Sequence, residues 1–387
     1  MAIPLKYNVR SLLVRRISTA MTGGGIALVV AVFVIVMALV AGLKSAISDT
    51  GSPDNIIVLR RGSTTETYSQ IQLAQFDAMK FLPQIRREPS GEADASPELP
   101  VQALMERVGG GRDNIVIRGV TPIALKVHDK VRIVEGRMFN PSVNEVVVGK
   151  GLASNYKNCT LGSTLRFGRG NWKVVGIMAA DGGSFESEVW GDIHNVQDDA
   201  QRGAYYADVR LKLAPGADQD ALIRRLTDDP QINLQGQTEA DYYQDQAVVA
   251  NQMRTLGMIV AVIMAIGAIF GAMNTMYAAV SSRTTEIGTL RALGFAPSAV
   301  MGSFLLESTV LAIAGGLLGI VLAMPINGLS TTFGNFVTFS TLAFSFRVTF
   351  AIVIEALIFA AVMGFVGGWL PARQAMKLAV VDALRSV

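Results

Sequence analysis

The hydrophobic residues of the chain gather in four long runs, the first of which lies near the N-terminus. No charged residue occurs between Arg16 and Lys44, a stretch that includes IALVVAVFVIVMALVAG. About twenty apolar residues in a helix cross the roughly 30 Å hydrocarbon core of a bilayer. The apolar core of a cleaved signal peptide usually has only about 7–15 residues. The first run therefore predicts a membrane span.

Three further runs lie in the C-terminal part of the chain. One is free of charge between Arg254 and Arg283, and the other two each carry a single glutamate. The expected organisation is a cytoplasmic amphipathic helix (1–17), a first span (18–44), an extracytoplasmic domain (45–238), a stalk helix that continues into the second span (239–282), a cytoplasmic coupling segment (283–297), a third span (298–326), a short extracytoplasmic loop (327–347), a fourth span (348–371) and a cytoplasmic tail (372–387).

Residues 45–238 follow a different pattern from the spans. Short runs rich in β-branched residues, such as Asn114–Val120 and Trp172–Met178, alternate with helical stretches. About two hundred residues can bury a substantial core, and this alternation favours an α+β domain in one or two lobes. The predicted fold class is an α-helical membrane protein with four transmembrane helices and a large α+β extracytoplasmic domain inserted between the first and second.

The stalk is predicted from residues 238–256, which contain neither proline nor glycine. Thr238 followed by Asp241 is typical of a helix N-cap with an acidic first turn. A helix over 239–282 would be about 66 Å long at 1.5 Å per residue, about twice the hydrocarbon thickness. We expect a single rod, and the alternative is a break at Gly257.

Lysine and arginine are unevenly distributed around the spans. Only Arg347 lies in the loop between the third and fourth spans. Nine residues flank the spans on the other side: Lys6, Arg10, Arg15, Arg16, Arg283, Arg291, Arg373, Lys377 and Arg385. Because cytoplasmic segments carry an excess of Lys and Arg, both termini are expected in the cytoplasm.

Composition supports this division of the chain. Half of the residues are hydrophobic and 17% are charged, with a mean hydropathy of +0.38. Residues 45–254 are acidic overall, with a net charge of about −4, although the whole chain is +3. Positive charge therefore collects at the membrane edges, and no basic domain is left to bind a nucleic acid.

Enzyme motifs are missing from the sequence. It contains no GxxxxGK[ST] phosphate-binding loop and no GxSxG nucleophile motif, so we assign no catalytic residue and expect no ATP hydrolysis by this chain. His128 and His194 lack the spacing of a metal site, and Cys159, the single cysteine, cannot form an internal disulfide. We expect neither a metal nor a cofactor bound to this chain.

Two glutamates and three pairs of glycines lie within the predicted spans. Glu307 and Glu355 could line a proton or substrate path, since an ionisable group in a span is costly; we favour pairing with polar neighbours or headgroups near the span ends. Small residues four apart allow close helix packing, within or between subunits. The glycine pairs are Gly267/Gly271, Gly315/Gly319 and Gly364/Gly368.

Two cytoplasmic segments carry a family resemblance. Residues 281–300 read SSRTTEIGTLRALGFAPSAV, and the chain ends GGWLPARQAMKLAVVDALRSV. With the four-span layout, they resemble the MacB/FtsX-type family of ABC transporter permeases. The EIGxxRAxG-like loop matches Glu286, Ile287, Gly288, Arg291, Ala292 and Gly294, and the tail motif matches Pro371, Ala372, Arg373, Ala375, Ala383, Leu384 and Arg385. The segments EVVVGKGLA, WKVVGI and VEGR resemble the MacB-like extracytoplasmic domain.

The resemblance implies that the loop after the second span is a coupling helix for a cytoplasmic ATPase. Its coupling residues would be Arg283, Glu286, Ile287, Leu290 and Arg291. Arg283 and Glu286 are three residues apart and can brace one another, while Ile287, Leu290 and Leu293 offer apolar contacts. Since no ATPase domain is fused to the chain, the resemblance implies two copies of a separate ABC ATPase, which bind ATP and Mg, and a second permease copy.

The resemblance also implies a location and a task. The location is the bacterial inner membrane, with the large domain in the periplasm, and the task is ATP-driven export of an amphiphilic, peptide or lipid-linked substrate. A periplasmic adaptor and an outer-membrane channel would be further partners. The alternatives are an FtsX-like regulator of a cell-wall hydrolase and a lipoprotein-releasing permease. The length of the segment 45–254 favours the MacB-like form.

Overall fold

The computed structural model describes residues 16–48, 50–335 and 340–378 of the chain. It divides into two compact units. The helical unit comprises residues 1–41, 250–329 and 346–387, and the α+β unit comprises residues 42–249 and 330–345. The expected amphipathic helix before Arg16 and the tail residues Ala383, Leu384 and Arg385 lie outside the described residues.

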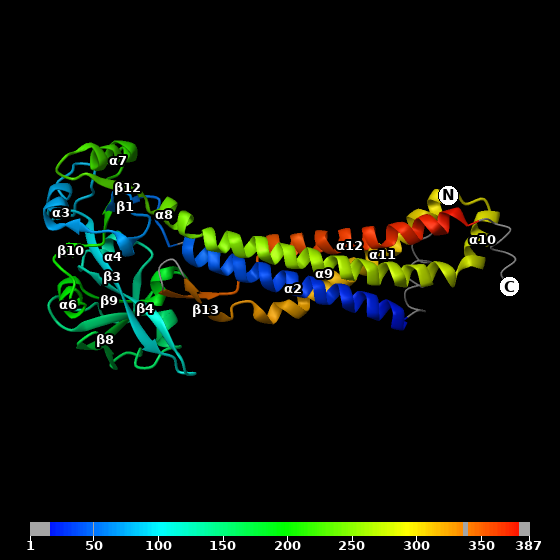
Figure 1. The fold of residues 1–387 in the computed structure, drawn as a ribbon, viewed down its shortest axis with the longest axis horizontal. Helices are drawn as coiled ribbons and strands as arrows, with labels where there is room; N and C mark the ends of the chain where they lie inside the picture. Colours follow the sequence, from blue (N-terminus) through cyan, green and yellow to red (C-terminus); the bar gives the residue numbers. More distant parts are fainter. Residues whose placement is uncertain (1–15, 49, 336–339, 379–387) are drawn as a thin grey trace. The chain divides into compact units, whose positions relative to one another are not determined.

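Four long helices form the helical unit. They are α2 (Arg16–Ser48), α9 (Val248–Ser281), α11 (Pro297–Ala323) and α12 (Phe350–Lys377). The short helices α10 (Thr284–Ala292) and η3 (Met324–Ile326) stand on either side of α11 in the sequence. Figure 1 shows the four long helices side by side, with α10 at one end of the bundle. Each long helix has the length and apolar composition of a membrane span, which confirms the expectation of four such helices.

The core of the bundle is built around α2. Two thirds of the most apolar window of α2 is buried, against 17% for the window on the helix that includes α9. Phe33 of α2 stacks on Phe359 of α12, with ring centroids 4.9 Å apart. Thr22 of α2 donates a hydrogen bond to Thr275 of α9 at 2.8 Å. The apolar surface of α9 thus remains largely uncovered within this chain.

The α+β unit is built on a ten-stranded sheet. Its strands are β1 (Asn55–Arg60), β3 (Ala95–Glu106), β4 (Arg112–Val120), β5 (Arg132–Gly136), β6 (Glu145–Gly149), β7 (Thr164–Phe167), β8 (Gly170–Ala179), β9 (Glu188–Asp192), β11 (Asp208–Lys212) and β12 (Leu234–Thr238). The order is β12-β1-β11-β3-β4-β9-β6-β8-β5, and β7 pairs with β8. A separate small sheet pairs β2 (Ile71–Gln72) with β10 (Tyr205–Tyr206).

Short helices connect and cover these strands. They are η1 (Glu66–Tyr68), α3 (Leu73–Met79), α4 (Ala124–Val127), α5 (Lys150–Ala153), η2 (Ser184–Ser187), α6 (Ile193–Asp199), α7 (Gln219–Asp228) and α8 (Glu239–Gln246). They cover two hydrophobic clusters, one around Ile56, Leu211 and Leu222 and the other around Val148 and Trp172. The long strand β3 contributes to both, so the unit has two lobes on one continuous sheet.

The segment expected as a single stalk helix is helical from Glu239 to Ser281, with one irregular turn. The helix α8 ends at Gln246, and α9 begins after Ala247. The N–H of Ala247 donates to the carbonyls of Tyr243, Gln244 and Asp245, an overwound turn. Tyr242 and Tyr243 are buried, and these contacts hold α8 in the α+β unit. The helical run expected over 239–282 is thus present from Glu239 to Ser281 with one irregular turn at Ala247, and the alternative break at Gly257 is absent from the described helix.

The expected loop over 327–347 contains a hairpin. Strand β13 (Ser330–Asn335) pairs with β14 (Ser340–Ser345), and the hairpin belongs to the α+β unit. Arg107, near the end of β3, donates a hydrogen bond to Thr332. The side chain of Ser187 accepts a hydrogen bond from the N–H of Ala343 at 2.7 Å. The α+β unit is therefore assembled from two separate stretches of sequence.

Candidate functional site

Charged side chains converge inside the α+β unit where the central strands of its sheet meet. On β11, Asp208 and Arg210 alternate with Val209 and Leu211, so they share one face of the strand while the apolar pair enters the first core. Glu98 of β3 and Arg118 of β4 lie on neighbouring strands. The buried ionic cluster consists of Glu66, Glu98, Arg118, His128, Glu188, Asp208, Arg210 and Glu239, all at most 7% exposed.

Arg118 holds three carboxylates of the cluster. Its guanidinium binds Glu188 in a bidentate pair, with both nitrogen–oxygen distances at 2.7 Å. The same group contacts Glu66 at 2.8 Å and Glu98 at 3.0 Å. These carboxylates come from η1, β3 and β9, so one buried arginine joins segments of both lobes.

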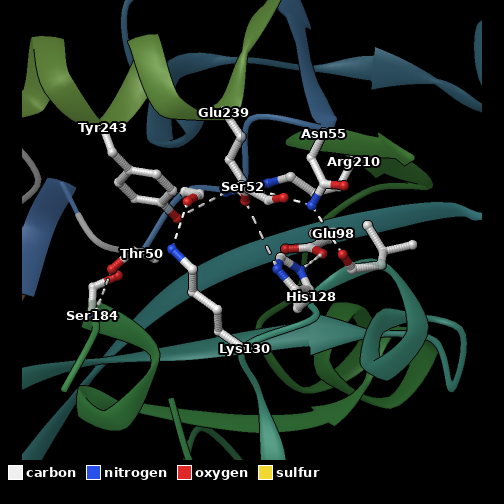
Figure 2. Close-up of polar contacts among 12 residues, drawn as sticks. Thr50, Ser52, Asn55, Glu98, His128, Lys130, Ser184, Arg210, Glu239 and Tyr243 are labelled. Carbon is white, nitrogen blue, oxygen red and sulfur yellow. Dashed lines mark hydrogen bonds and ion pairs between the residues drawn. The ribbon is translucent and has the colours of Figure 1, made fainter. Parts of the chain in front are cut away.

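Arg210 holds the other end of the cluster, beside α8. It binds Asp208 at 2.9 Å and Glu66 at 2.5 Å, and it also pairs with Glu239. Figure 2 shows Glu239 and Tyr243 reaching down from α8 toward Arg210, with His128 and Glu98 below them. The imidazole Nε2 of His128 lies 2.6 Å from Glu98. The cluster therefore attaches α8 to the sheet.

Burial and the two guanidinium groups act in opposite directions on the carboxyl groups. Burial by itself would raise the pKa of Glu98, but His128, Arg118 and Arg210 together bring that pKa below its usual range. Burial, reinforced by Glu66, raises the pKa of Asp208 well above its usual range. This shift favours the protonated, neutral form of Asp208, which reduces the excess of negative charge inside the cluster.

A cavity of about 450 Å³ lies beside the cluster. Glu66, Arg118 and Glu188 face it from the cluster, and Tyr242 and Tyr243 face it from α8. Its apolar lining includes Leu99 and Val101 of β3. Its size is typical of small-molecule sites.

The expected coupling residues of α10 divide into buried and exposed sets. Arg283, just before α10, is buried and pairs with Glu307 of α11 at 3.0 Å. Ile287 is buried in a cluster with residues of α9, α11 and α12. Arg291 donates to the carbonyls of Met376 and Leu378 at 3.0 and 2.9 Å.

The accessible face of α10 is opposite in character to the buried set: it carries exposed side chains. Glu286 is exposed, Leu290 is partly buried and Leu293 is 72% exposed. Ile287 is buried within this chain, where its side chain helps to pack the bundle, and its coupling role stays a prediction. Glu286 and Leu293 are the members of the predicted set that a partner could reach.

The two glutamates within the apolar helices both have basic neighbours. Glu307 forms the buried pair with Arg283. Glu355 of α12 lies 4.0 Å from Arg254 of α9, and both side chains are about half exposed. Pairing with polar neighbours is the arrangement we favoured from the sequence.

The three glycine pairs differ in their surroundings. A Cβ at Gly319 would overlap the carbonyl oxygen of Ala27 on α2, and one at Gly364 would overlap Ala312 on α11. A Cβ at Gly315 would likewise meet the carbonyl oxygen of Gly23 on α2, and one at Gly368 would meet the side chain of Ser308 on α11. Gly267 and Gly271 on α9 have no atom within 4 Å of such a Cβ. Two pairs therefore pack helices within this chain, and the third does not.

The remaining candidate residues, two histidines and the cysteine, have different surroundings. His128 is buried in the ionic cluster, whereas His194 is exposed on α6. The thiol of Cys159 is fully buried in the second core, and burial raises its pKa to about 12. Among the described residues, no group of three or more His, Cys, Asp or Glu side chains is arranged to hold a metal ion.

Sequence comparison identifies the class and then the family. Residues 19–229 match the MacB-like periplasmic core domain, and residues 258–380 match the FtsX-like permease C-terminal domain. The first match covers more than half of the chain, so the chain belongs to the MacB-like family. Members of this family are ABC transporter permease components of the inner membrane that carry a periplasmic domain.

Relatives in several bacteria align with almost the whole chain. It is 27% identical over 421 residues to the macrolide export ATP-binding/permease protein MacB of Bdellovibrio bacteriovorus, covering 98% of this chain and 61% of that protein. It is 27% identical over 411 residues to the pyoverdine export ATP-binding/permease protein PvdT of Pseudomonas entomophila, covering 97% and 58%. The chain thus spans about three fifths of the length of these relatives.

Among solved structures, the periplasmic region of MacB from Actinobacillus actinomycetemcomitans covers 51% of this chain, at 11% identity and a TM-score of 0.38. The alignment includes 94% of that structure.

Proposed function

We propose that this chain is the membrane permease subunit of an ABC exporter in the bacterial inner membrane. A separate ATPase, in two copies and loaded with ATP and Mg, would bind on the cytoplasmic side, and the chain would pair with a second permease copy. The family assignment carries this proposal. Residues 1–387 contain no GxxxxGK[ST] motif, so the proposal places ATP hydrolysis outside these residues.

The distribution of charge supports the orientation in this proposal. Basic residues flank α10 and the end of α12, and by the positive-inside rule they favour a cytoplasmic position for these segments. The α+β unit would then face the periplasm. ATP hydrolysis would move this unit in the periplasm. There it would act together with a periplasmic adaptor and an outer-membrane channel.

Export is favoured over regulation of a cell-wall hydrolase or release of lipoproteins. The segment between the first two long helices matches the MacB-like core domain, and two relatives are named as exporters of a macrolide and of pyoverdine. We propose an amphiphilic, peptide or lipid-linked substrate taken from the periplasmic side.

The exposed face of α10 provides the test. Leu293→Asp places a charge on an exposed apolar position beside α10, and Leu329→Asp is a matched control because Leu329 is also exposed, in the loop after η3. We expect Leu293→Asp to lower recovery of the purified permease–ATPase complex and its ATP turnover at least about tenfold, a loss of about 1.4 kcal/mol of binding. Leu329→Asp should leave both unchanged. Normal assembly and turnover with Leu293→Asp would refute the docking assignment.

A further inference from the structure

Three segments of the α+β unit adjoin long helices in the sequence, and each is held by contacts within that unit. Thr50 follows α2, and its hydroxyl accepts a hydrogen bond from the N–H of Ser184 at 2.7 Å. Ala343 on β14 precedes α12 and is held by Ser187 of η2. The helix α8 precedes α9 by one residue. All three segments lie within the α+β unit.

One carboxylate joins two of these segments to the sheet. Glu239 is the first residue of α8 and is 1% exposed. Its Oε2 accepts from the backbone N–H of Ser52 at 3.0 Å and from Asn55 Nδ2 at 2.9 Å. Its Oε1 pairs with Arg210 of β11. Figure 2 shows these contacts around the labelled carboxylate.

The backbone of Glu239 adds to this attachment. A Cβ at Gly51 would lie 2.7 Å from the carbonyl oxygen of Glu239, so the segment after α2 passes directly against the start of α8. Only glycine fits this close approach without displacing one of the two backbones. The two connections are therefore in contact through both side chain and main chain.

The helix α8 has eight residues and is separated from α9 by Ala247 alone. Side-chain contacts attach it to the rest of the α+β unit. Tyr242 accepts a hydrogen bond from the N–H of Glu66 at 3.3 Å, and Tyr243 accepts one from Arg210 at 3.3 Å. Glu239 is the member of this helix that also reaches the segment after α2.

We propose that Glu239 is a positioning residue that fastens α8 and the segment after α2 to the sheet, so that these two connections follow the sheet as one body. The inference rests on the proposed function for its purpose: a movement started at the long helices would be delivered to the sheet through this carboxylate. Glu239→Gln keeps the size of the side chain but removes the charge that Arg210 pairs with.

The test uses the full chain with two spin labels and no nucleotide. Cys159→Ala removes the single native cysteine, and labels are attached at Gln244→Cys on α8 and Thr164→Cys on β7, both exposed positions. We expect Glu239→Gln to broaden the distance distribution about twofold or to add a second population, because α8 gains freedom relative to the sheet.

The matched control is Glu145→Gln. Glu145 also accepts a bidentate pair from an arginine, Arg137, and a bond from a backbone N–H, that of Asn140. It holds no segment next to a long helix. Glu145→Gln should leave the distribution as narrow as in the parent. An equally narrow distribution in Glu239→Gln would overturn the inference.

A second variant covers the case in which Glu239→Gln does not fold. Asn55→Leu removes one of the two donors to Oε2 and leaves the pair with Arg210, so a smaller broadening is expected. A distribution unchanged from the parent would overturn the inference.

The complex with the ATPase separates this inference from the proposed function. If Glu239→Gln keeps ATP turnover but loses export, the proposed role of Glu239 is supported. If ATP turnover and export both stay at parental levels, that role is wrong. This conclusion holds even where Leu293→Asp still lowers ATP turnover. If no ATPase associates with the chain, the proposed function fails, while the label distances still decide whether Glu239 fastens α8.

Discussion

Arg118→Met should destabilise the α+β unit more than any ordinary surface change. The substitution preserves much of the side-chain volume but removes the charge that Glu66, Glu98 and Glu188 share. Removing one partner of a buried ion pair costs about 3–5 kcal/mol, since the other charge stays buried and unpaired. Folded domains are stable by only about 5–15 kcal/mol, so this loss is a large part of the total.

Urea unfolding of the full chain in detergent measures the effect. Trp369→Phe leaves Trp172 and Trp190, both buried in the α+β unit, as the fluorescent reporters. Trp190 donates a hydrogen bond to Glu188 at 3.0 Å and so reports on the cluster itself. With a slope of about 2 kcal/mol per M urea, a loss of about 4 kcal/mol lowers the midpoint by about 2 M.

The control is Arg132→Met, which removes an arginine that pairs with Asp181 at 2.7 Å while both side chains are about 60% exposed. An exposed pair contributes about 0–1 kcal/mol, so the midpoint should shift by less than about 0.5 M. Adding Glu188→Leu to Arg118→Met should recover part of the loss, because one orphaned carboxylate is removed. Equal shifts for Arg118→Met and Arg132→Met would refute the reasoning.

Three further predictions concern separate parts of the chain. Gly319→Leu should lower the stability of the helical unit in detergent by about 1–3 kcal/mol in a thermal unfolding experiment, because a Cβ at this position would meet Ala27. Gly267→Leu should change the stability little. Equal effects of the two substitutions would contradict the packing of Gly319 against α2. The native Cys159 thiol should react with a maleimide at pH 7 at least about tenfold more slowly than the unfolded chain, since burial raises its pKa to about 12; fast labelling of the folded chain would contradict its burial. Burial raises the pKa of Asp208, so the folded state holds a proton that the unfolded state releases, and stability falls as pH rises above the usual carboxyl range. Asp208→Asn should reduce this fall in urea midpoints between pH 5 and pH 8, and an unchanged slope would exclude Asp208 as its source.

The sequence was most informative about the long helices. Uncharged runs between Arg16 and Lys44 and between Arg254 and Arg283 predict two of them directly, because length and hydropathy are enough to mark such helices. The irregular turn at Ala247 was not predictable in this way. Nothing in the local sequence marks it, and it directly follows Tyr242 and Tyr243, which are buried in the α+β unit.

The buried ionic cluster was missed because its members lie far apart in the sequence. Arg118 lies on β4 and Arg210 on β11, and their carboxylate partners come from η1, β3, β9 and α8. One local signal was present: Asp208, Arg210 and Lys212 occupy alternate positions on β11, and all are buried. Charges at every second position of a strand between apolar residues indicate a buried polar face.

The position of Ile287 shows the limit of reasoning from one motif. Its place in the EIGxxRAxG-like loop marks α10 as a whole, but only the packing of α10 against α9, α11 and α12 shows which of its side chains are accessible. Such packing depends on residues far away in the sequence, including Ala372 and Ala375, which are 85 and 88 positions from Ile287. The accessible set is therefore a property of the fold.

The central claim of the proposed function is that α10 lies in the cytoplasm, where it would bind the ATPase, and that the α+β unit lies on the other side of the membrane. Labelling of single cysteines with a membrane-impermeant maleimide tests it, using Thr289→Cys on α10 and Thr164→Cys on β7, both exposed, in a Cys159→Ala chain. In cells whose outer membrane alone is opened, the cysteine at position 164 should react and the one at position 289 should react only after the inner membrane is also permeabilised. Reaction of both cysteines in the first condition, or of the cysteine at 289 alone, would contradict the account.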